Sequence, residues 1–255
     1  MTRPYAEVIG DPIAQSKSPR IHGFWLGKLG IAADYRAAHV RAEELPNYFA
    51  SRRADGNWRG CNITMPHKQA AMALVDRLDP AAARIGAINT VVPEDGGLAG
   101  YNTDAPGFLE PLGNRCFSVV TVIGAGGAAR AILAALADRG VEWVSLQNRS
   151  IAKGEALLAE FSLPGCVLAP GAEVREADLL VNTSSLGMAG FPPMPPVECH
   201  VKAGGTVYDI VTTPLVTDLL KAAERRGLAT IDGLAMLIGQ AAVAFERFFG
   251  QPAPR

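Results

Sequence analysis

The stretch from Val119 to Ser150 constrains the fold of this chain more than any other. An apolar, β-branched run over Val119–Ile123 stops at Gly124, and a glycine-rich turn follows it. Apolar residues then recur with helical spacing over Ala128–Leu136, and a second strand-like run covers Trp143–Gln147. Strand, glycine-rich turn, helix and strand in this order form the dinucleotide-binding half-unit. The sequence therefore predicts an α/β chain with a Rossmann-type, doubly wound domain.

The turn itself fits the G-x-G-x-x-G/A pattern through Gly124, Gly126 and Ala129. Gly124 allows the tight turn, Gly126 lets backbone amides approach a pyrophosphate, and a small Ala129 lets helix and strand pack closely. The positive end of the helix would then face the phosphates. Glycines also serve ordinary turns, but both flanking strands are in place here, which favours the cofactor loop. The predicted loop contacts are Gly124, Ala125, Gly126, Gly127 and Ala128.

The end of the second strand indicates which dinucleotide binds. Enzymes that use NAD usually place an acidic residue about 20 residues after the glycines, on the ribose 2′-hydroxyl. This chain has Asn148, Arg149 and Ser150 there, with Lys153 one turn further on. Two cations without a carboxylate suit a 2′-phosphate, which an arginine binds bidentately. The sequence predicts NADP, held by these four residues.

Composition restricts the class of protein further. The 255 residues are 49% hydrophobic and 19% charged, which suits one large or two modest folded domains. A net charge of −1 gives no reason to expect a nucleic-acid or membrane partner. The four cysteines form no C-x-x-C pair, and no cluster of metal ligands is evident. We find neither a signal peptide nor a run of about 18 apolar residues, so we expect a soluble cytoplasmic protein without a metal.

Two polar segments precede the predicted nucleotide domain. After a strand over Tyr5–Ile9, Ser18 is expected to cap a helix with Pro19 at its first position, and both Ser16 and Ser18 could serve only as caps. Further on, Pro66 is expected to open a helix, which would put Lys68 in its first turn. A cation is unfavourable there because of the helix dipole, which hints at a functional lysine rather than an ordinary surface one.

The remaining elements alternate between strands and helices. A strand pair is expected over Ile85–Val92 and Leu98–Asp104, joined through Asp95–Gly97, and each strand ends in an Asn-Thr pair. The predicted domains are residues 1–104 completed by a C-terminal helix in 232–255, and residues 105–231. The later elements that we expect are the helices 106 onwards, 151–161, 214–226 and 233–249 and the strands 177–182, 205–211 and 228–231.

Taken together, the chain resembles the shikimate dehydrogenase family over almost its whole length. The resemblance rests on the segments GDPIAQSKSPRIH, GCNITMPHK, GAINT, GYNTD, IGAGGAARA, QNRSIAK, VNTSSLGM, VYDIV and DGLAMLIGQAAVAFERF, which occur in the family's order. It implies an N-terminal α/β substrate domain, a Rossmann-type NADP domain and a C-terminal helix that returns to the first domain, with the active site in the cleft. The implied reaction is the reversible NADPH-dependent reduction of 3-dehydroshikimate to shikimate, in the pathway to the aromatic amino acids.

The resemblance also assigns roles to particular residues. It makes Lys68 the general acid and base and Asp104 its partner at the reacting oxygen, which suits a ketone reduction that needs a proton donor. It places Ser16 and Ser18 at the substrate carboxylate, with Thr64 near them. Neutral side chains suit a polyol, because an unpaired buried hydroxyl is costly. The remaining assignments are Asn89 and Gln240 to the ring hydroxyls, Thr212 to the substrate, and Ile210 and Gly233 to the cofactor.

Two positions depart from the family's pattern. Gly23 stands where the family often has Asn, and Thr212 stands where it usually has a tyrosine that reaches the substrate carboxylate. The alternatives are therefore an enzyme of this family that acts on quinate or an aminoshikimate, and a non-catalytic NADP-binding protein. A methylene-tetrahydrofolate dehydrogenase shares the two-domain plan, but the paired serines and the Asn-Thr-Asp segment favour the first family. The substrate would be a small cyclic hydroxy acid, and the chain could act as a monomer or a homodimer.

Overall fold

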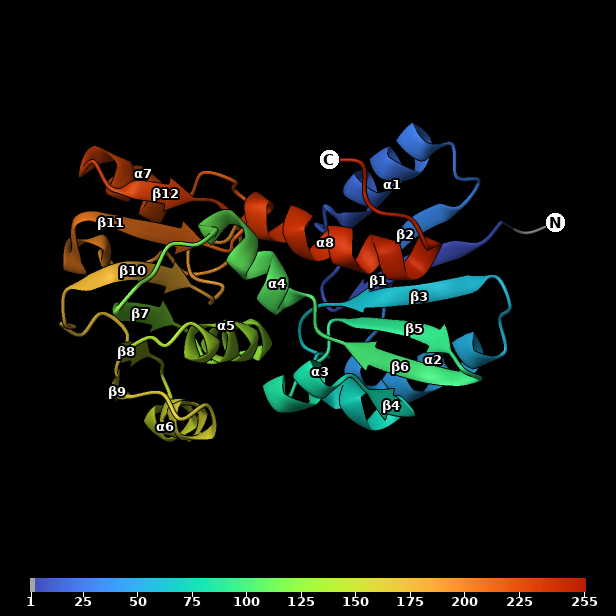
Figure 1. Ribbon diagram of the computed structural model, residues 1–255, viewed down its shortest axis with the longest axis horizontal. Helices are drawn as coiled ribbons and strands as arrows, with labels where there is room; N and C mark the ends of the chain where they lie inside the picture. The colour runs from blue at the N-terminus through green and yellow to red at the C-terminus, as the bar shows by residue number, and fades with distance from the viewer. Residues whose placement is uncertain (1–2) are drawn as a thin grey trace. The chain divides into compact units, whose positions relative to one another are not determined.

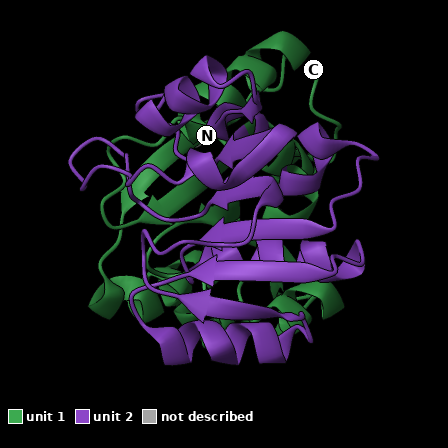
Figure 2. Cartoon of the chain, turned by 90° about the vertical axis from the view of Figure 1, so that its left-hand side faces the viewer, with its two compact units in different colours: residues 1–107, 238–255 green, residues 108–237 purple. Residues whose placement is uncertain are grey.

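The computed structural model describes residues 3–255 and divides the chain into two compact units (Figure 2). Unit 1 contains the chain up to Gly107 together with Ile238–Arg255, and unit 2 is Phe108–Leu237. Each unit is built around a six-stranded sheet of the described residues. The boundaries between the units fall inside two helices, α4 (Asp104–Leu109) and α8 (Gly233–Phe249).

The sheet of unit 1 is mixed, with the strand order β2-β1-β3-β5-β6-β4 (Figure 1). β1 lies parallel to both β2 and β3, whereas β5 is antiparallel to β3 and β6. β4 then pairs with β6 in parallel. The strands are β1 (Tyr5–Gly10), β2 (Asp34–His39), β3 (Trp58–Ile63), β4 (Arg77–Leu78), β5 (Thr90–Glu94) and β6 (Gly97–Tyr101).

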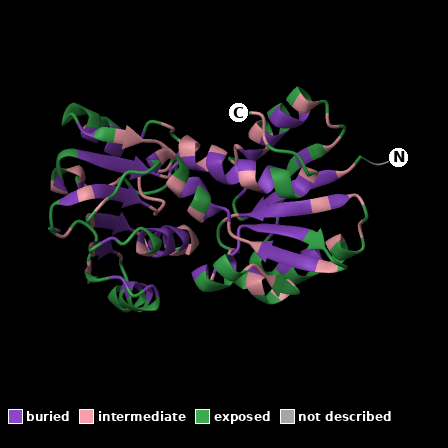
Figure 3. Ribbon diagram, viewed as in Figure 1, coloured by how far each residue is buried: buried purple, intermediate pink, exposed green. Residues whose placement is uncertain are grey.

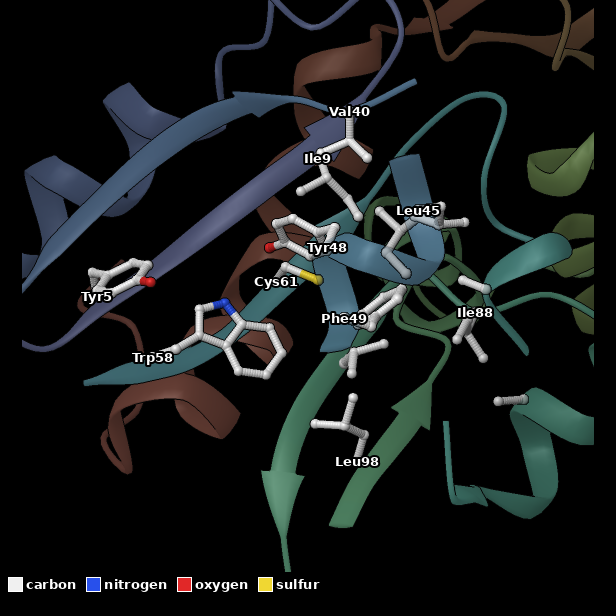
Figure 4. Packing of buried hydrophobic residues seen from close by; sticks show 14 residues of the cluster. Tyr5, Ile9, Val40, Leu45, Tyr48, Phe49, Trp58, Cys61, Ile88 and Leu98 are labelled. Atoms are coloured by element: carbon white, nitrogen blue, oxygen red, sulfur yellow. The ribbon is translucent and has the colours of Figure 1, made fainter. Parts of the chain in front are cut away.

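Helices cover both faces of this sheet, so β1 is buried on both sides. Successive side chains of a strand point to opposite faces. Ala6 and Val8 pack with α1 and α8, whereas Tyr5 and Ile9 pack with α2 (Figure 4). The helical segments are α1 (Ser18–Leu29), η1 (Ala42–Glu44), α2 (Leu45–Arg53), η2 (Ala70–Leu74) and α3 (Pro80–Ile85). The C-terminal helix thus completes a core that the N-terminal strands begin.

Unit 2 has a fully parallel sheet with the order β12-β11-β10-β7-β8-β9. If these six strands are numbered 1 to 6 along the chain and the order is read from β9 to β12, it becomes 3-2-1-4-5-6. This order defines the doubly wound dinucleotide-binding fold. The predicted fold class is confirmed. The strands are β7 (Val119–Ile123), β8 (Trp143–Gln147), β9 (Gly165–Leu168), β10 (Ala177–Asn182), β11 (Val201–Asp209) and β12 (Ala229–Ile231).

The central strands β7, β8 and β10 of unit 2 are mostly buried, whereas the edge strands β9 and β12 are partly exposed (Figure 3). Parallel sheets are covered on both faces by their crossover helices, which explains the continuous apolar runs. On the α7 face, the core includes Leu180, Val207 and Leu220. The helical segments are η3 (Glu110–Leu112), α5 (Gly127–Asp138), α6 (Ile151–Glu160), η4 (Glu198–His200) and α7 (Asp218–Arg225).

Two predicted elements of unit 1 were wrong. Residues 85–89 do not belong to a strand: α3 ends at Ile85, Gly86 adopts the left-handed conformation that closes a helix, and β5 begins only at Thr90. Pro66 does not open a helix either, because residues 65–69 form turns and helical structure starts at Ala70 as 3₁₀. Lys68 therefore lies outside any helical first turn, and the argument from the helix dipole does not apply to it.

The ends of other elements were also misplaced. Lys17, not Ser18, is the N-cap of α1, and Ser18 is its first residue. In unit 2, β11 runs over Val201–Asp209 and α7 begins only at Asp218, where the Thr217 hydroxyl accepts a hydrogen bond from the Leu220 amide. The short strand β9 was not predicted at all, because its four residues lack a clear period. Within residues 3–255, no helix is long and apolar enough to cross a membrane.

Candidate active site

The topology of unit 1 gathers its polar segments at one edge of the sheet. β1, β3 and β6 run in the same direction, so their carboxyl ends lie at the same edge. β5 runs the opposite way, so its first residues lie at that edge as well. The segments that meet there are 11–18 after β1, 64–68 after β3, Asn89 before β5 and 102–104 after β6.

Lys68 and Asp104 form an ion pair at this edge. The Lys68 Nζ lies 2.5 Å from Asp104 Oδ2, and the two side chains are 15% and 6% exposed. The Lys68 carbonyl accepts a hydrogen bond from the Ile88 amide at 2.8 Å, which fixes the turn. Asp104 begins α4, and Asn102 Oδ1 accepts from its amide at 3.0 Å. The backbone of both partners is therefore held in place.

Asn89 binds the second carboxylate oxygen. Its Nδ2 donates to Asp104 Oδ1 at 2.9 Å, while its Oδ1 accepts from the Thr103 amide at 2.7 Å. Gln240 Oε1 lies 3.5 Å from the same Nδ2. Asn89 and Gln240 are 2% and 8% exposed. Donors on both oxygens stabilise the ionised carboxylate, so this cluster can hold an ammonium group at a defined position.

The predicted carboxylate-binding residues follow the same strands. Ser18 is buried, and its amide donates to Ser16 Oγ at 3.3 Å. The Thr64 amide donates to the Ile9 carbonyl at 2.9 Å, which continues the pairing of β1 with β3. A Cβ on Gly10 would lie 2.4 Å from Thr64 Cγ2, so the glycine makes room for this threonine. Ser16, Ser18 and Thr64 thus flank the edge on which Lys68 lies.

Sequence reasoning assigned no role to several buried polar residues of this cluster. The Asn62 side chain bonds to Tyr35 and Thr90, and Thr103 bonds to Asn89. Their signal was the repeated Asn-Thr pair, at 89–90 and at 102–103, which turn chemistry alone could explain. The register of the sheet brings the two pairs together, with Thr90 opposite Tyr101.

In unit 2 the glycine loop follows β7. Gly124 has φ +102°, and a Cβ there would lie 2.9 Å from Thr183 Oγ1, so the position requires glycine. Gly126 is the exposed N-cap of α5, and a Cβ on it would meet nothing in residues 3–255 within 4 Å. Ala129 is fully buried. An open backbone at a helix N-terminus is the arrangement that accommodates a pyrophosphate.

The predicted 2′-phosphate site lies after β8. Arg149 and Lys153 are exposed, and neither forms an ion pair within the described part of the chain. Ser150 caps α6 by accepting from the Lys153 amide at 3.3 Å, and Asn148 Nδ2 donates to the Ser150 carbonyl at 2.8 Å. By contrast, Arg130 is already paired with Glu160. The residues present fit a phosphate group, with two cations beside an ordered turn.

The other predicted contacts of unit 2 follow β11 and β12. The Ile210 amide donates to the Asn182 carbonyl at 3.2 Å, and Thr212 is half-buried. A Cβ on Gly233 would lie 2.3 Å from the Val211 carbonyl oxygen, so glycine is required at the start of α8. Asp232 Oδ1 accepts from the Leu234 amide at 3.0 Å and caps that helix. No group of three His, Cys, Asp or Glu side chains among the described residues could hold a metal ion.

The strand order and the glycine loop define a nucleotide-binding α/β protein, and a lysine paired with a buried carboxylate is suited to moving a proton. Comparisons with known proteins narrow this class. The family described as "Shikimate dehydrogenase substrate binding domain" matches residues 8–91, and "Shikimate 5'-dehydrogenase C-terminal domain" matches residues 233–255.

Full-length relatives support the same family. A protein of Sphingopyxis alaskensis named shikimate dehydrogenase (NADP(+)) is 58% identical over 98% of this chain and 93% of its own. A shikimate 5-dehydrogenase of Thermus thermophilus, solved with NADP(H) and shikimate, has a TM-score of 0.87 at 38% identity, covering 98% of this chain and 95% of that one. A quinate dehydrogenase of Corynebacterium glutamicum, solved with NAD, has a TM-score of 0.86 at 31% identity, covering 99% and 95%. The chain belongs to the shikimate dehydrogenase family.

Proposed function

We propose that this protein is an NADP-dependent oxidoreductase that interconverts 3-dehydroshikimate and shikimate. The observation that carries the proposal is the Lys68–Asp104 pair, whose carboxylate is also bound by Asn89. These groups lie at the edge of the unit 1 sheet where β1 leads to Ser16 and Ser18 and β3 leads to Thr64. Unit 1 would bind the substrate and unit 2 the cofactor. The substrate would be a small cyclic hydroxy acid, and no partner macromolecule is proposed.

Lys68 would supply and remove the proton. NADPH, when bound, supplies the hydride that reduces the carbonyl carbon. As negative charge develops on the carbonyl oxygen, the Lys68 ammonium stabilises it and donates a proton from Nζ. In the oxidation of the alcohol, neutral Nζ takes that proton back. Asp104 Oδ2 accepts a hydrogen bond from Nζ and orients it, and the Asn89 amide holds the carboxylate from the other side.

Substrate binding would rest on neutral polar side chains. Asn89 and Gln240 offer amide donors and acceptors to ring hydroxyls, and Ser16, Ser18 and Thr64 offer hydroxyls to the carboxylate. Each unpaired hydroxyl of a polyol is costly when buried, so such a set discriminates by hydrogen bonding. On the cofactor side, Gly124–Ala128 would cradle the pyrophosphate, and Asn148, Arg149, Ser150 and Lys153 would bind the 2′-phosphate. Ile210 and Gly233 stay predicted cofactor contacts.

Quinate is the second candidate substrate. The observation in its favour is Thr212, at the position where the family usually has a tyrosine, together with the similarity to a quinate dehydrogenase. A lost hydrogen bond to a carboxylate costs about 1.5–3 kcal/mol, roughly 10- to 150-fold. We expect a high KM for shikimate, because this contact is mostly ground-state binding.

The test is to follow NADPH absorbance with shikimate and quinate, each with NADP and with NAD. Turnover of shikimate with NADP supports the proposal, and no turnover of either acid contradicts it. Thr212→Tyr should lower the KM for shikimate and raise that for quinate. If the tyrosine variant binds shikimate no better, Thr212 is not a substrate contact.

A further inference from the structure

A chain of buried hydrogen bonds leads to Asn89 from the interior of unit 1. Tyr35 of β2 bonds to Asn62 Oδ1 at 2.6 Å, and Asn62 Nδ2 lies 3.0 Å from the Thr90 hydroxyl. The Thr90 hydroxyl in turn lies 3.1 Å from Asn89 Oδ1. All four residues are less than 9% exposed, and Thr90 is fully buried. None of the first three has a role in the proposed reaction.

Two main-chain groups determine the orientation of both side-chain amides in this chain of hydrogen bonds. The Asn89 carbonyl can only accept, and it lies 3.3 Å from Asn62 Nδ2, so this end of the Asn62 amide must be the NH₂ group. Asn62 Oδ1 then faces Tyr35, whose hydroxyl must donate to it. The Thr103 amide can only donate, and it lies 2.7 Å from Asn89 Oδ1. The NH₂ group of Asn89 therefore faces Asp104.

These two constraints fix the Thr90 hydroxyl as the acceptor from Asn62 Nδ2. Its own proton is available to Asn89 Oδ1 at 3.1 Å, which is the shorter contact, while the Thr103 hydroxyl lies 3.4 Å away. A reversed Asn89 amide would place its NH₂ against the Thr103 amide and its oxygen against the Asp104 carboxylate, two repulsive contacts. The Thr90 hydroxyl is a second donor, beside the Thr103 amide, to the side-chain oxygen of Asn89. Buried hydrogen-bond networks of this kind stabilise a single orientation when every member is satisfied.

We infer that Thr90 is a positioning residue for the reaction: its hydroxyl, oriented by Asn62 and Tyr35, holds the Asn89 amide in the orientation that fixes the Asp104 carboxylate. The inference rests on the proposed function for its effect on catalysis. Thr90 is fully buried, so it acts through Asn89 and not by touching the substrate. Misplacement of a reacting group by about 1 Å can cost on the order of 100-fold in rate.

The test compares two substitutions at Thr90. Thr90→Val keeps the shape and removes the hydroxyl, whereas Thr90→Ser keeps the hydroxyl and removes a methyl group. We expect kcat to fall by roughly tenfold or more in the valine variant and to stay within about threefold in the serine variant. The affinity for NADPH should be unchanged in both, because all of these residues belong to unit 1.

Thr121→Val is the matched control. Thr121 is also fully buried, on β7, and its hydroxyl has no partner among residues 3–255. The same change of side chain there should leave kcat unaltered. If Thr90→Val fails to fold, Tyr35→Phe tests the far end of the chain. Because the Tyr35 side chain also bonds to Ser18, the comparison uses kcat at saturating shikimate, which we expect to fall by several-fold.

A readout that does not need turnover separates this inference from the proposed function. The side-chain amide resonance of Asn89 in NMR spectra should shift in Thr90→Val and keep its wild-type position in Thr90→Ser. An unchanged resonance with unchanged kcat in Thr90→Val would overturn the inference, as would equal losses of kcat in both variants, which would indicate packing. A wild-type protein that turns over neither acid would contradict the proposed function alone, and the amide resonance would still decide the role of Thr90.

Discussion

The two units present functional groups at one edge of their sheets in opposite ways. In unit 1 the candidate site consists of side chains that bind one another, with Lys68, Asp104 and Asn89 as its centre. In unit 2 the candidate site consists of accessible main-chain groups, with Gly126 exposed as the N-cap of α5. Substitutions that remove side-chain groups should therefore damage the site of unit 1, whereas substitutions that add a side chain should damage the site of unit 2.

The largest effect is expected where unit 1 loses its charged group. Lys68→Ala should lower kcat by about 10²–10⁴, the usual range for a lost general acid or base, and leave NADP binding intact. Steady-state kinetics and a cofactor titration check this, with Asp104→Asn as a second variant that should also impair turnover. A near-normal kcat in Lys68→Ala would assign proton transfer to another group.

His22, like Trp58, is a buried residue of unit 1 whose ring nitrogens have no hydrogen-bond partner within residues 3–255. It is fully buried and stacks on the Tyr35 ring with centroids 3.9 Å apart. Burial lowers the pKa of His22 to about 3 from an ordinary 6.5. Below pH 6.5 the unfolded chain therefore binds a proton that the folded chain rejects until about pH 3. The stability contribution of neutral His22 is complete above this window and is lost as the pH falls through it.

His22→Phe should remove that dependence on pH. Between about pH 7.5 and about pH 4.5, the wild type should lose about 3 kcal/mol of unfolding free energy that the variant keeps. Urea unfolding of both proteins at the two pH values measures the difference. Carboxylates titrate in both proteins alike, so equal losses in the two would show that His22 becomes protonated without unfolding.

In unit 2 the exposed cations should decide the choice of cofactor. Arg149→Asp should weaken NADP binding by about 1.5–3 kcal/mol, roughly 10- to 150-fold, and reverse or flatten the preference over NAD. Arg225→Asp, the same charge change at an exposed position of α7, is the control. Titration of each protein with both cofactors gives the ratio. A wild type that uses NAD as well as NADP would contradict the predicted phosphate site.

A single added methyl group should distinguish the two glycines of the loop. Gly124→Ala forces a side chain into φ +102° and against Thr183, so we expect a loss of about 1–3 kcal/mol in stability. Gly126→Ala meets nothing within 4 Å among residues 3–255, so its stability should change by less than about 1 kcal/mol while NADPH affinity falls. Urea unfolding without cofactor and an NADPH titration separate the two effects. Unchanged NADPH affinity in Gly126→Ala would place the pyrophosphate elsewhere.

Several elements of the fold could be predicted because their sequence signals are local. β7, β8, β10 and α8 have the predicted bounds, because apolar runs closed by glycine or polar turns need no distant partner to be read. The family resemblance assigned roles to Lys68 and Asp104, which stay predictions, whereas the separate reason from a helix dipole at Lys68 was wrong. The residues of the family pattern were sufficient to name the family.

The contacts between polar residues that are far apart in the sequence follow from the tertiary structure alone. Asn89 and Gln240 are separated by 151 positions, and Asn89 Nδ2 lies 3.5 Å from Gln240 Oε1. Tyr35 of β2 reaches Asn62 of β3 across the intervening strand β1. Residue type and spacing carry no information on such contacts, because strand order and register bring the partners together. Local patterns likewise misplaced two elements of unit 1. Gly86 ends α3 where the apolar run predicted a strand, and the segment after Pro66 forms a turn, with the Lys68 carbonyl accepting from Ile88, where the proline predicted a helix. Propensity acts over a few residues, whereas the buried network that positions Asp104 exists only once the sheet has formed.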